Sequence, residues 1–410
     1  MRVAVVEKKE LSDILLAKSA RIDDEVMLIF EQLGIAKILE KVLYPLKGAQ
    51  VIDKKERILL ELNQSSSSDF APLYGFYQPD AQKILQNKAA QHPNIHIFAG
   101  YEVETFEQNE TQVNVYVTKT EVQNFFTINA SYLIDCNGQY SRIADFLEIE
   151  TENFGYYNAV LCVDTVCQEK IPLQCYAQTI YDAELPVIRI TNDEKHQRWE
   201  FQIEQENVKD FYTSEKVRNL LSELSTLHLD IESAFVYNFD SKILLEWRKN
   251  RVFIAGDAAH IMPPYLGMGL SAGIKDIYNL AWKIKLVQEE ILTSEILDSY
   301  QLERAAAVRH LIHLNLWIKR LFKSSKLRWI KLLVPILPKW FLKQKLDTTT
   351  LVKEGIIGHK SYGAGTAMLS PKIATHKGEV LGFNNILACN FVLVALDKNP
   401  VDALQPKQLE

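Results

Sequence analysis

The sequence predicts an α/β protein, and three observations lead to this prediction. A short apolar run, residues 252–255, ends at Gly256 and has the pattern of a buried parallel strand. Two prolines and two glycines then precede a helix that starts near Leu270. Residues 156–237 have a different composition, in which strand-like segments dominate. We therefore expect a mixed β-sheet domain inserted into an α/β domain, followed by a helical C-terminal region.

Length and composition exclude several classes of protein. The chain has 410 residues, of which 47% are hydrophobic and 24% charged, so we expect a globular enzyme of two or three domains. The net charge of -6 gives no reason to expect a nucleic-acid partner. Five cysteines without C-x-x-C spacing indicate neither a disulfide framework nor a zinc site, which favours the cytoplasm. The first ten residues lack the long apolar core of a signal peptide, and we find no uncharged apolar run of membrane-spanning length.

The stretch from Gly256 to Leu270 has the features of a ligand site. Asp257 follows the strand at its carboxyl end, where open α/β sheets hold their ligands. The glycines at 267 and 269 let the backbone approach a ligand closely. Free backbone N–H groups at the helix start favour a phosphate or an electron-rich, partly anionic ring. The alternative is a plain strand-to-helix turn.

At these residues the chain resembles the FAD-dependent aromatic hydroxylases, which are flavoprotein monooxygenases of the p-hydroxybenzoate hydroxylase fold. The resemblance is greatest to the 3-(3-hydroxyphenyl)propionate hydroxylase group and extends over most of the chain. It is carried by the Gly-Asp-Ala-Ala-His motif at residues 256–260 and by the proline and glycine stretch after it. The resemblance implies that Asp257 bonds the ribityl chain of FAD. It also implies that the isoalloxazine ring lies along Pro263, Pro264, Gly267, Met268, Gly269 and the helix start at Leu270.

The resemblance further implies the chemistry. A member of this family hydroxylates a phenolic or other aromatic compound, using NAD(P)H and O2, and the protein mainly orients the ring and excludes water. His260 is a candidate catalytic residue, because an imidazole near the flavin could relay the phenolic proton. The alternative is that His260 is a structural hydrogen-bonding residue.

The N-terminal segment suggests an incomplete Rossmann-like unit. Residues 2–6 have the pattern of a buried strand, and Glu7 fits the acidic residue that bonds the adenosine ribose. In the family the first strand and the glycine-rich turn, about 30 residues, precede this position. Three explanations stay open: a misplaced start or a shortened chain, a natural fragment that another chain completes, and a degenerate protein that binds FAD poorly.

Three further cofactor contacts are implied by the resemblance. Arg21 opens a segment, residues 21–30, that has the pattern of an amphipathic helix and is closed by Leu33-Gly34. Gln78 precedes Pro79 at another helix start, and a simple capping turn is the alternative there. Val103 lies in the second of three strands, residues 94–98, 101–107 and 112–118, that we expect to form a meander.

A second family signature departs from its usual form. Asn137 stands where the family has aspartate, and Ala144 stands where it has arginine, whereas Gly138 and Ser141 are kept. Alanine does not hold a nucleotide phosphate as a guanidinium does. These departures favour the alternative function, a truncated or degenerate family member that acts as a non-catalytic binding or regulatory protein.

The resemblance also sets the expected domains. Residues 1–150 and 246–345 form a discontinuous FAD-binding domain with C-terminal helices, and residues 151–245 form the substrate-binding sheet domain. Residues 346–410 form a C-terminal extension, the remnant of a thioredoxin-like domain, with one strand at residues 390–396. The residues that could line the substrate pocket, with core packing as the alternative, are Tyr176, Arg189, Arg198, Trp199 and Phe201.

Two association modes stay open. Between Glu303 and Asp347 the chain carries only basic charged residues, interleaved with Leu, Ile and Trp. This pattern fits weak contact with a membrane surface, and it also fits helices that cover the FAD-binding domain. A homo-oligomer is equally open.

Overall fold

The computed structural model describes residues 1–11, 20–64, 66, 68–119, 125–182, 185–203, 214–323, 355, 372–374, 378 and 380–382. The helices are α1 (Asp24–Gln32), α2 (Ala36–Leu39), α3 (Gln78–Ala90), α4 (Ile143–Phe146), α5 (Ser214–Leu224), α6 (Gly269–Gln288) and α7 (Ser299–Lys323). The strands are β1 (Val3–Glu7), β2 (Arg21–Asp23), β3 (Leu43–Leu46), β4 (Gly48–Ile52), β5 (Ile58–Asn63), β6 (Leu73–Phe76), β7 (Ile95–Ala99), β8 (Tyr101–Gln108), β9 (Val113–Lys119), β10 (Phe125–Ala130), β11 (Leu133–Asp135), β12 (Thr151–Cys167), β13 (Tyr176–Ile180), β14 (Val187–Thr191), β15 (His196–Ile203), β16 (Leu229–Leu244), β17 (Arg248–Lys249), β18 (Val252–Ile254), β19 (His260–Ile261), β20 (Lys372–Ala374) and β21 (Val380–Gly382).

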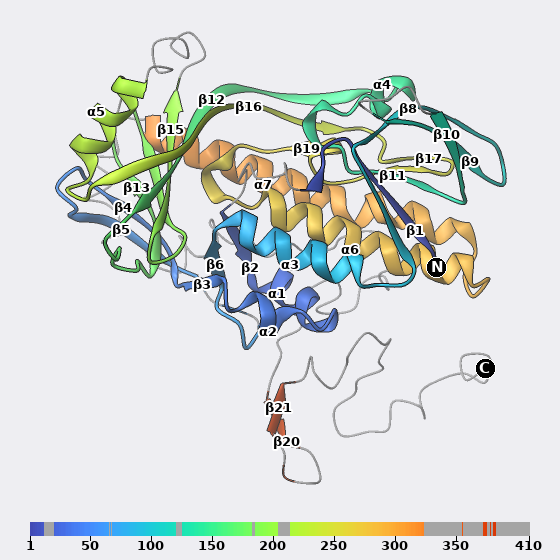
Figure 1. Ribbon diagram of the computed structural model, residues 1–410, viewed down its shortest axis with the longest axis horizontal. Coiled ribbons are helices and arrows are strands. Elements are labelled where there is room, and N and C mark those ends of the chain that lie inside the picture. The colour runs from blue at the N-terminus through green and yellow to red at the C-terminus, as the bar shows by residue number, and fades with distance from the viewer. Residues whose placement is uncertain are drawn as a thin grey trace.

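The largest sheet is mixed, as predicted, and has the order β19-β16-β12-β15-β14-β13-β4-β5. Its pairs are antiparallel except for β13 and β4, which are parallel. The long strands β12 and β16 run from the part of the molecule near α5 to the part near α4 (Figure 1). Besides the segment 151–245 expected from the sequence, the sheet takes in β4 and β5, residues 48–63, and the short β19. The predicted domain boundaries stay predictions.

One face of this sheet is closed by α5. Trp199 and Phe201 are fully buried there, in a cluster with Val217 and Leu221 of the helix. Side chains alternate across a strand, so Arg198 projects from the opposite face. Trp199 and Phe201 therefore serve the core, which was the alternative to a pocket role.

The N-terminal strands pair differently from the prediction. β1 pairs in parallel with β7, so residues 94–98 do not join the meander, which consists of β8, β9 and β10. Val3 and Val5 of β1 are exposed, and the prediction of a buried strand is wrong. A strand's own pattern does not show which neighbours cover it, and this is the physical reason for both differences.

The segment predicted as one helix from Arg21 begins as a strand. Residues Arg21–Asp23 form β2, which pairs with β6, and the helix α1 starts at Asp24. The Asp23 carboxylate caps this helix by accepting the N–H of Val26 at 3.0 Å. At the other end Gly34 takes a φ of +70°, which confirms the predicted glycine stop.

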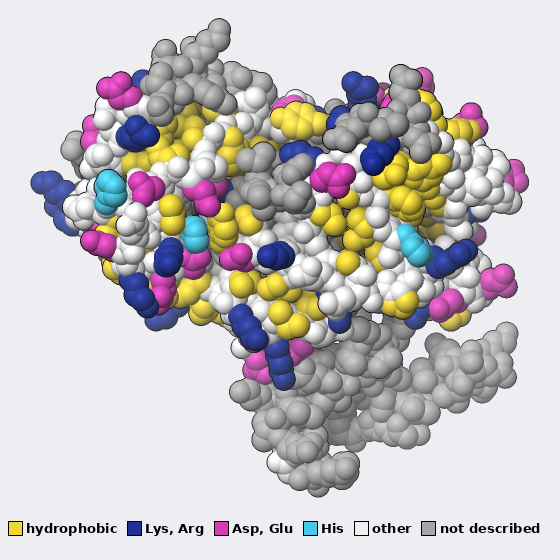
Figure 2. Space-filling model, in the orientation of Figure 1, with side chains coloured by type: hydrophobic (Ala, Val, Ile, Leu, Met, Phe, Trp, Pro, Cys, Tyr) yellow, Lys and Arg dark blue, Asp and Glu magenta, His cyan; other side chains and the backbone are white. Residues whose placement is uncertain are grey.

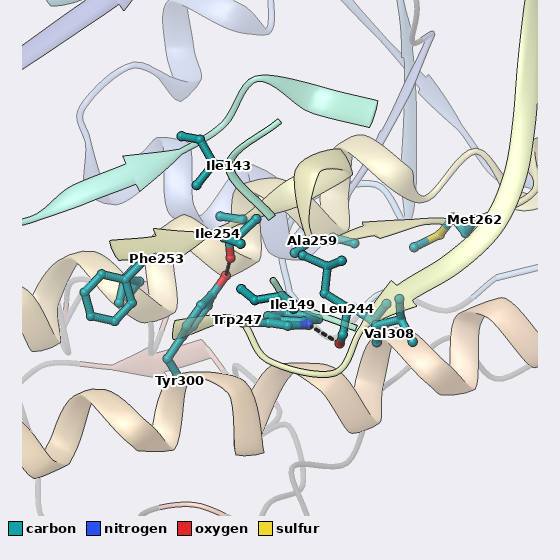
Figure 3. Packing of buried hydrophobic residues seen from close by; sticks show 14 of the residues in the cluster. Ile143, Ile149, Leu244, Trp247, Phe253, Ile254, Ala259, Met262, Tyr300 and Val308 are labelled. Atoms are coloured by element: carbon teal, nitrogen blue, oxygen red, sulfur yellow. Dashed lines mark hydrogen bonds between the residues drawn. The ribbon is translucent and has the colours of Figure 1, made fainter. Parts of the chain in front are cut away.

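The parallel strand predicted at residues 252–255 is confirmed as β18, which pairs in parallel with β11 and whose three residues are all buried. The long helices α6 and α7 lie side by side (Figure 1). Tyr300 of α7 donates its hydroxyl hydrogen bond to the Ile254 carbonyl at 3.0 Å, and the Trp247 indole N–H donates to Leu244 O at 3.1 Å (Figure 3). These bonds satisfy the polar ends of two fully buried aromatic side chains.

The surface and the C-terminal segment add little to the site. On the face drawn in Figure 2, basic and acidic side chains are interspersed, and hydrophobic side chains gather at both ends. None of the helices in the described residues is long and apolar enough to cross a membrane. The predicted strand at residues 390–396 lies outside the described residues, as do the basic residues from Lys326 to Lys345.

Candidate functional site

The turn that follows β18 rests directly on helix α6. Gly256 has a φ of +60°, and its N–H donates to Asp276 Oδ2 at 3.2 Å. A Cβ placed on Gly273 of α6 would lie 3.2 Å from the Gly256 Cα. The two glycines therefore allow a close approach that fixes Asp257, the next residue, at the end of the strand.

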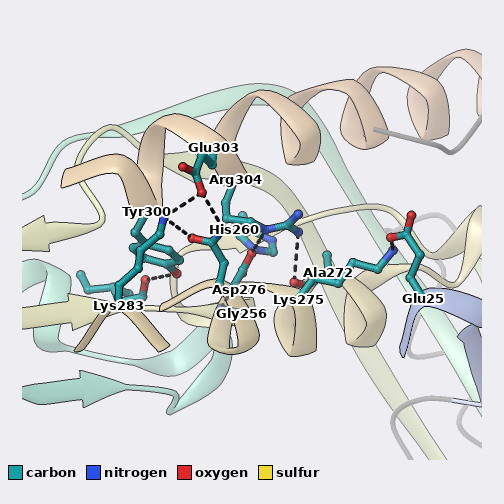
Figure 4. Close-up of polar contacts among 12 residues, drawn as sticks. Glu25, Gly256, His260, Ala272, Lys275, Asp276, Lys283, Tyr300, Glu303 and Arg304 are labelled. Atoms are coloured by element: carbon teal, nitrogen blue, oxygen red, sulfur yellow. Dashed lines mark hydrogen bonds and ion pairs between the residues drawn. The ribbon is translucent and has the colours of Figure 1, made fainter. Parts of the chain in front are cut away.

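A buried set of polar groups holds this turn, and we call it the turn network: Gly256, His260, Ala272, Asp276 and Arg304. His260 Nε2 and Asp276 Oδ2 lie 2.6 Å apart, and Arg304 Nε donates to Asp276 Oδ1 at 2.9 Å (Figure 4). Arg304 also donates to the Ala272 carbonyl at 3.3 Å. Burial raises the pKa of Asp276, but His260 and Arg304 more than offset it, so the pKa lies below its usual value.

His260 is an internal member of this network. The residue is 1% exposed, and its ring stacks on Trp247 at a centroid distance of 5.1 Å. Because the ring is enclosed on all sides, it has no open face for a substrate. The predicted catalytic role stays a prediction, and the contacts instead give His260 a positioning role.

The glycine stretch forms an open helix N-terminus. A short 3-10 helix, η5 (Pro264–Leu266), ends at Gly267, which has a φ of +62°. Helix α6 then begins at Gly269, with Met268 as a cap residue that makes no side-chain hydrogen bond to it. The first backbone N–H groups of an α-helix have no partner within the helix. They are therefore available to an electron-rich ligand, as the sequence predicted for this stretch.

Arg21 reaches this loop from a distant part of the chain. A Cβ on Gly267 would lie 2.6 Å from Arg21 Nε, so the guanidinium occupies the space beside the glycine. Two contacts to α6 hold β2 in place: Asp23 N–H donates to Ser271 Oγ at 3.2 Å, and Lys275 Nζ donates to Asp23 Oδ2 at 2.7 Å. Burial lowers the pKa of Arg21, and the nearby Glu200 opposes that shift.

Asp257 lies between the sheet and the start of α6. Its Oδ2 accepts the Tyr237 hydroxyl of β16 at 3.4 Å. Its Oδ1 lies 3.9 Å from the place where a Cβ of Gly269 would be. The structure thus gathers Arg21, Asp257 and residues 267–270, and we call this group the loop site.

The other three predicted cofactor residues lie on separate elements. Glu7 ends β1, and its carboxylate accepts the Lys9 N–H at 2.9 Å. Val103 is partly buried on β8, which lies beside β1. Gln78 is the first residue of α3. The cofactor roles of Glu7, Val103 and Gln78 stay predictions.

The family comparison agrees with this geometry. A family model described as FAD binding domain matches residues 1–314 of the chain. The chain belongs to this FAD-binding family. The match includes every candidate residue from Glu7 to Leu270, together with the turn network.

Curated relatives in the comparison are hydroxylases. The 3-(3-hydroxy-phenyl)propionate/3-hydroxycinnamic acid hydroxylases of Escherichia coli (strain SMS-3-5 / SECEC) and Shigella sonnei (strain Ss046) are 24% identical to this chain. In each case the match covers all of this chain and 76% of the relative. These relatives confirm the family predicted from residues 256–270.

Solved structures share the fold. The flavin-dependent monooxygenase PieE, in complex with FAD and substrate, superposes with a TM-score of 0.79 at 16% identity, over 94% of this chain and 79% of PieE. Aklavinone-11 hydroxylase with FAD and aklavinone gives 0.75 at 18% identity, over 94% and 78%. These neighbours confirm the α/β fold class of a flavin-dependent monooxygenase.

The loop site of this FAD-binding family member fits the cofactor. The Asp257 carboxylate is an acceptor suited to the hydroxyl groups of a ribityl chain, and the open N–H groups of α6 suit an electron-rich ring edge. A side chain at Gly267 would collide with Arg21, so the backbone itself forms the surface there. FAD, when bound, supplies the redox chemistry.

Sequence reasoning missed part of this arrangement. Asp276 was assigned only to an amphipathic helix, although a buried acid seven positions after Gly269 lies on the same helix face. This spacing was a usable signal. The sequence around Tyr237 gave no such signal, because the contact of Tyr237 with Asp257 depends on how β16 crosses the site.

Proposed function

We propose that this protein is an FAD-dependent monooxygenase that hydroxylates a phenolic or other aromatic compound, with NAD(P)H as reductant and O2 as co-substrate. The observation that carries the proposal is the loop site: Arg21, Asp257 and the open N-terminus of α6 meet in a chain of the FAD-binding family. Relatives named as hydroxylases support catalysis and give no support to a non-catalytic role.

The chain's own residues bind and orient. Asp257 would accept hydrogen bonds from the ribityl hydroxyls, and the N–H groups at residues 268–270 would stabilise negative charge at the nearby edge of the flavin ring. Arg21 would add a fixed positive charge beside that edge. The turn network keeps Asp257 in place. Within the network the Asp276 carboxylate and the Arg304 guanidinium neutralise one another inside the core.

The reductant is the finer part of the proposal. The η2 turn (Gly138–Tyr140) follows β11, and the Ser141 hydroxyl donates to Asp135 Oδ2 at 2.5 Å. The Asp135 carboxylate also accepts the Asn137 N–H at 3.0 Å, so this turn keeps an ordered shape although Asn137 replaces the aspartate of the family. We propose that NAD(P)H reduces the flavin of this protein but binds less tightly than to family members with arginine at position 144, because Ala144 offers no guanidinium to the nucleotide phosphate.

The cell compartment is also proposed, from the cysteines. Cys136, Cys162, Cys167 and Cys175 are free thiols, which suits a reducing cytoplasm. Fractionation of cells that express the native gene tests this assignment.

A spectroscopic experiment tests the proposed function. Purified protein is titrated with FAD, and the visible spectrum is followed before and after anaerobic NADPH or NADH is added with a panel of aromatic compounds. We expect a bound-flavin spectrum that bleaches with one of the nucleotides, and oxygen then gives a hydroxylated product. If no FAD binds at micromolar concentrations, the proposal fails for this chain.

A further inference from the structure

The face of the large sheet opposite α5 looks onto the loop site, and we call it the inner face. The register of the strands fixes which residues belong to this face, because residues directly opposite one another on neighbouring strands project to the same side of a sheet. Gln202, Val160 and Tyr237 are such a row of cross-strand partners. Tyr237 identifies that side, since its hydroxyl reaches Asp257. The polar members of the inner face include Asp164, Arg198, Glu200, Gln202, Ser233 and Tyr237.

The β2 end of the loop site lies against this face. Ala20 forms a buried cluster with Ile188 and Ile190, whose register partners on β15 are Glu200 and Arg198. A Cβ on Gly75 of β6, the strand paired with β2, would lie 3.3 Å from the Thr191 carbonyl of β14. The inner face and the loop site therefore face one another at close range.

Charges on the inner face are balanced. Arg198 makes two bonds of 2.8 Å to the Asp164 carboxylate, and the Ser233 hydroxyl donates to the same carboxylate at 3.0 Å. The second acid, Glu200, attracts Arg21 from the loop site. The two acids thus face two guanidinium groups, and Asp257 adds one more negative charge.

The nearby histidine does not change this balance. His196 pairs with Asp193 at 2.7 Å and stacks on Tyr77 at a centroid distance of 4.5 Å. Among the described residues, the inner face therefore offers no cation in excess. A substrate carboxylate placed there would lose its hydration without gaining an opposite charge.

Gln202 is the buried side chain of the described residues in which both polar atoms lack a partner. The residue is 5% exposed, and neither Oε1 nor Nε2 makes a hydrogen bond within the described residues. Buried amides in folded proteins are nearly always paired. A primary amide presents an acceptor and a donor in one plane, so its complement is a group with a donor and an acceptor side by side.

We infer that the substrate is an uncharged phenol that presents a carboxamide, lactam or hydroxy-ketone group to Gln202, rather than an aromatic acid with a free carboxylate. This inference rests on the proposed function, because it places the aromatic ring between the inner face and the loop site. It separates this chain from the hydroxylases named for phenylpropionate to which it is similar. Gln202 would act as a specificity-determining residue.

The test compares matched ligands that differ only in charge. The FAD-loaded protein is titrated with 3-(3-hydroxyphenyl)propanamide and with 3-(3-hydroxyphenyl)propionate, and then with 2-hydroxybenzamide and 2-hydroxybenzoate. Binding is followed by the perturbation of the flavin spectrum without any nicotinamide nucleotide. We expect each amide to bind at least about tenfold more tightly than its acid at neutral pH. An acid that binds as tightly as its amide overturns the inference, and so does an absence of binding by both amides.

Two variants on strand β15 test whether the preference for amides arises from the inner face of the sheet. Gln202→Leu should remove the preference for amides and leave FAD affinity unchanged. Gln197→Leu is the matched control. Gln197 is also a buried glutamine of β15, but it precedes Arg198 and therefore projects to the α5 side of the sheet. The Gln197→Leu variant should keep the preference for amides. A preference that survives in Gln202→Leu overturns the inference.

The design separates this inference from the proposed function. If FAD does not bind, the proposed function fails, and the same ligand pairs are titrated against tryptophan fluorescence of the protein alone. If FAD binds and the nucleotide reduces it while amides show no preference, only the inference about the substrate fails.

Discussion

The turn network and the inner face both bury charged side chains, but they assemble them from different distances along the chain. The turn network joins residues 256–304, one continuous segment, and its charged pair, Asp276 and Arg304, lies 28 residues apart. The inner face takes Glu200 and Tyr237 from two strands of the large sheet, and Glu200 is balanced by Arg21 of the loop site, which lies on a third element. The local set holds the backbone of the cofactor loop, whereas the long-range set leaves Gln202 open. The bonded carboxylate and guanidinium of the turn network therefore position the cofactor loop, whereas Gln202, with neither of its polar atoms paired, is free to recognise a ligand.

The largest effect is expected where the turn network loses its anion. Asp276→Ala leaves the Arg304 guanidinium buried without its counter-charge, which costs about 3–5 kcal/mol of the free energy of unfolding. Urea unfolding measures this loss. The exposed pair Arg248–Asp298 provides the control, because Asp298→Ala should change stability by less than about 1 kcal/mol. Equal effects of the two variants would contradict a structural role for the network.

The next prediction compares two glycines that both have a positive φ. Gly267→Ala forces a Cβ into the space of the Arg21 guanidinium, so FAD affinity should fall about tenfold or more. Gly34→Ala also has a positive φ, but its Cβ meets nothing within 4 Å. It should lower stability by about 1 kcal/mol and leave FAD affinity intact. Flavin titration and thermal unfolding of both variants check this pair.

A smaller effect is expected for the loop-site carboxylate. Asp257→Asn keeps one acceptor oxygen and removes the charge, so FAD affinity should fall about tenfold through the weaker hydrogen bonds to the ribityl hydroxyls. Stability without FAD should change little, because Asp257 lies at the open end of the strand and not in the turn network. An unchanged FAD dissociation constant would argue against the loop site as the cofactor site.

The smallest effect concerns the pH dependence of the inner face. Burial raises the pKa of Glu200 in spite of Arg198 and Arg21, which lower it. A raised carboxyl pKa favours folding below the unfolded pKa, and this contribution is lost as the pH rises through the folded pKa. Glu200→Gln should therefore gain stability relative to the native protein as the pH rises. A constant difference between the two proteins from acid to neutral pH would contradict this assignment.

Local signals account for what the sequence predicted well. The strand β18, the turn at Gly256 and the start of α6 are specified by neighbouring residues, so residues 252–270 were predicted nearly as found. The start of α1 was misplaced because Arg21 pairs with Gly75 of β6, a contact that no helical pattern reveals. The same limit applies to Gln202, whose lack of a partner depends on the folding of the sheet around it.

The pairing of β4 with β13 restricts how this protein recombines. Strands β4 and β5 lie in the first part of the chain, yet they complete the sheet built from residues 151–245. A chimera that exchanges only residues 151–245 with a relative would have to form the parallel β4–β13 ladder between foreign partners. Residues 48–63 have to be exchanged together with residues 151–245, so the smallest exchangeable unit that contains this sheet is discontinuous in the sequence.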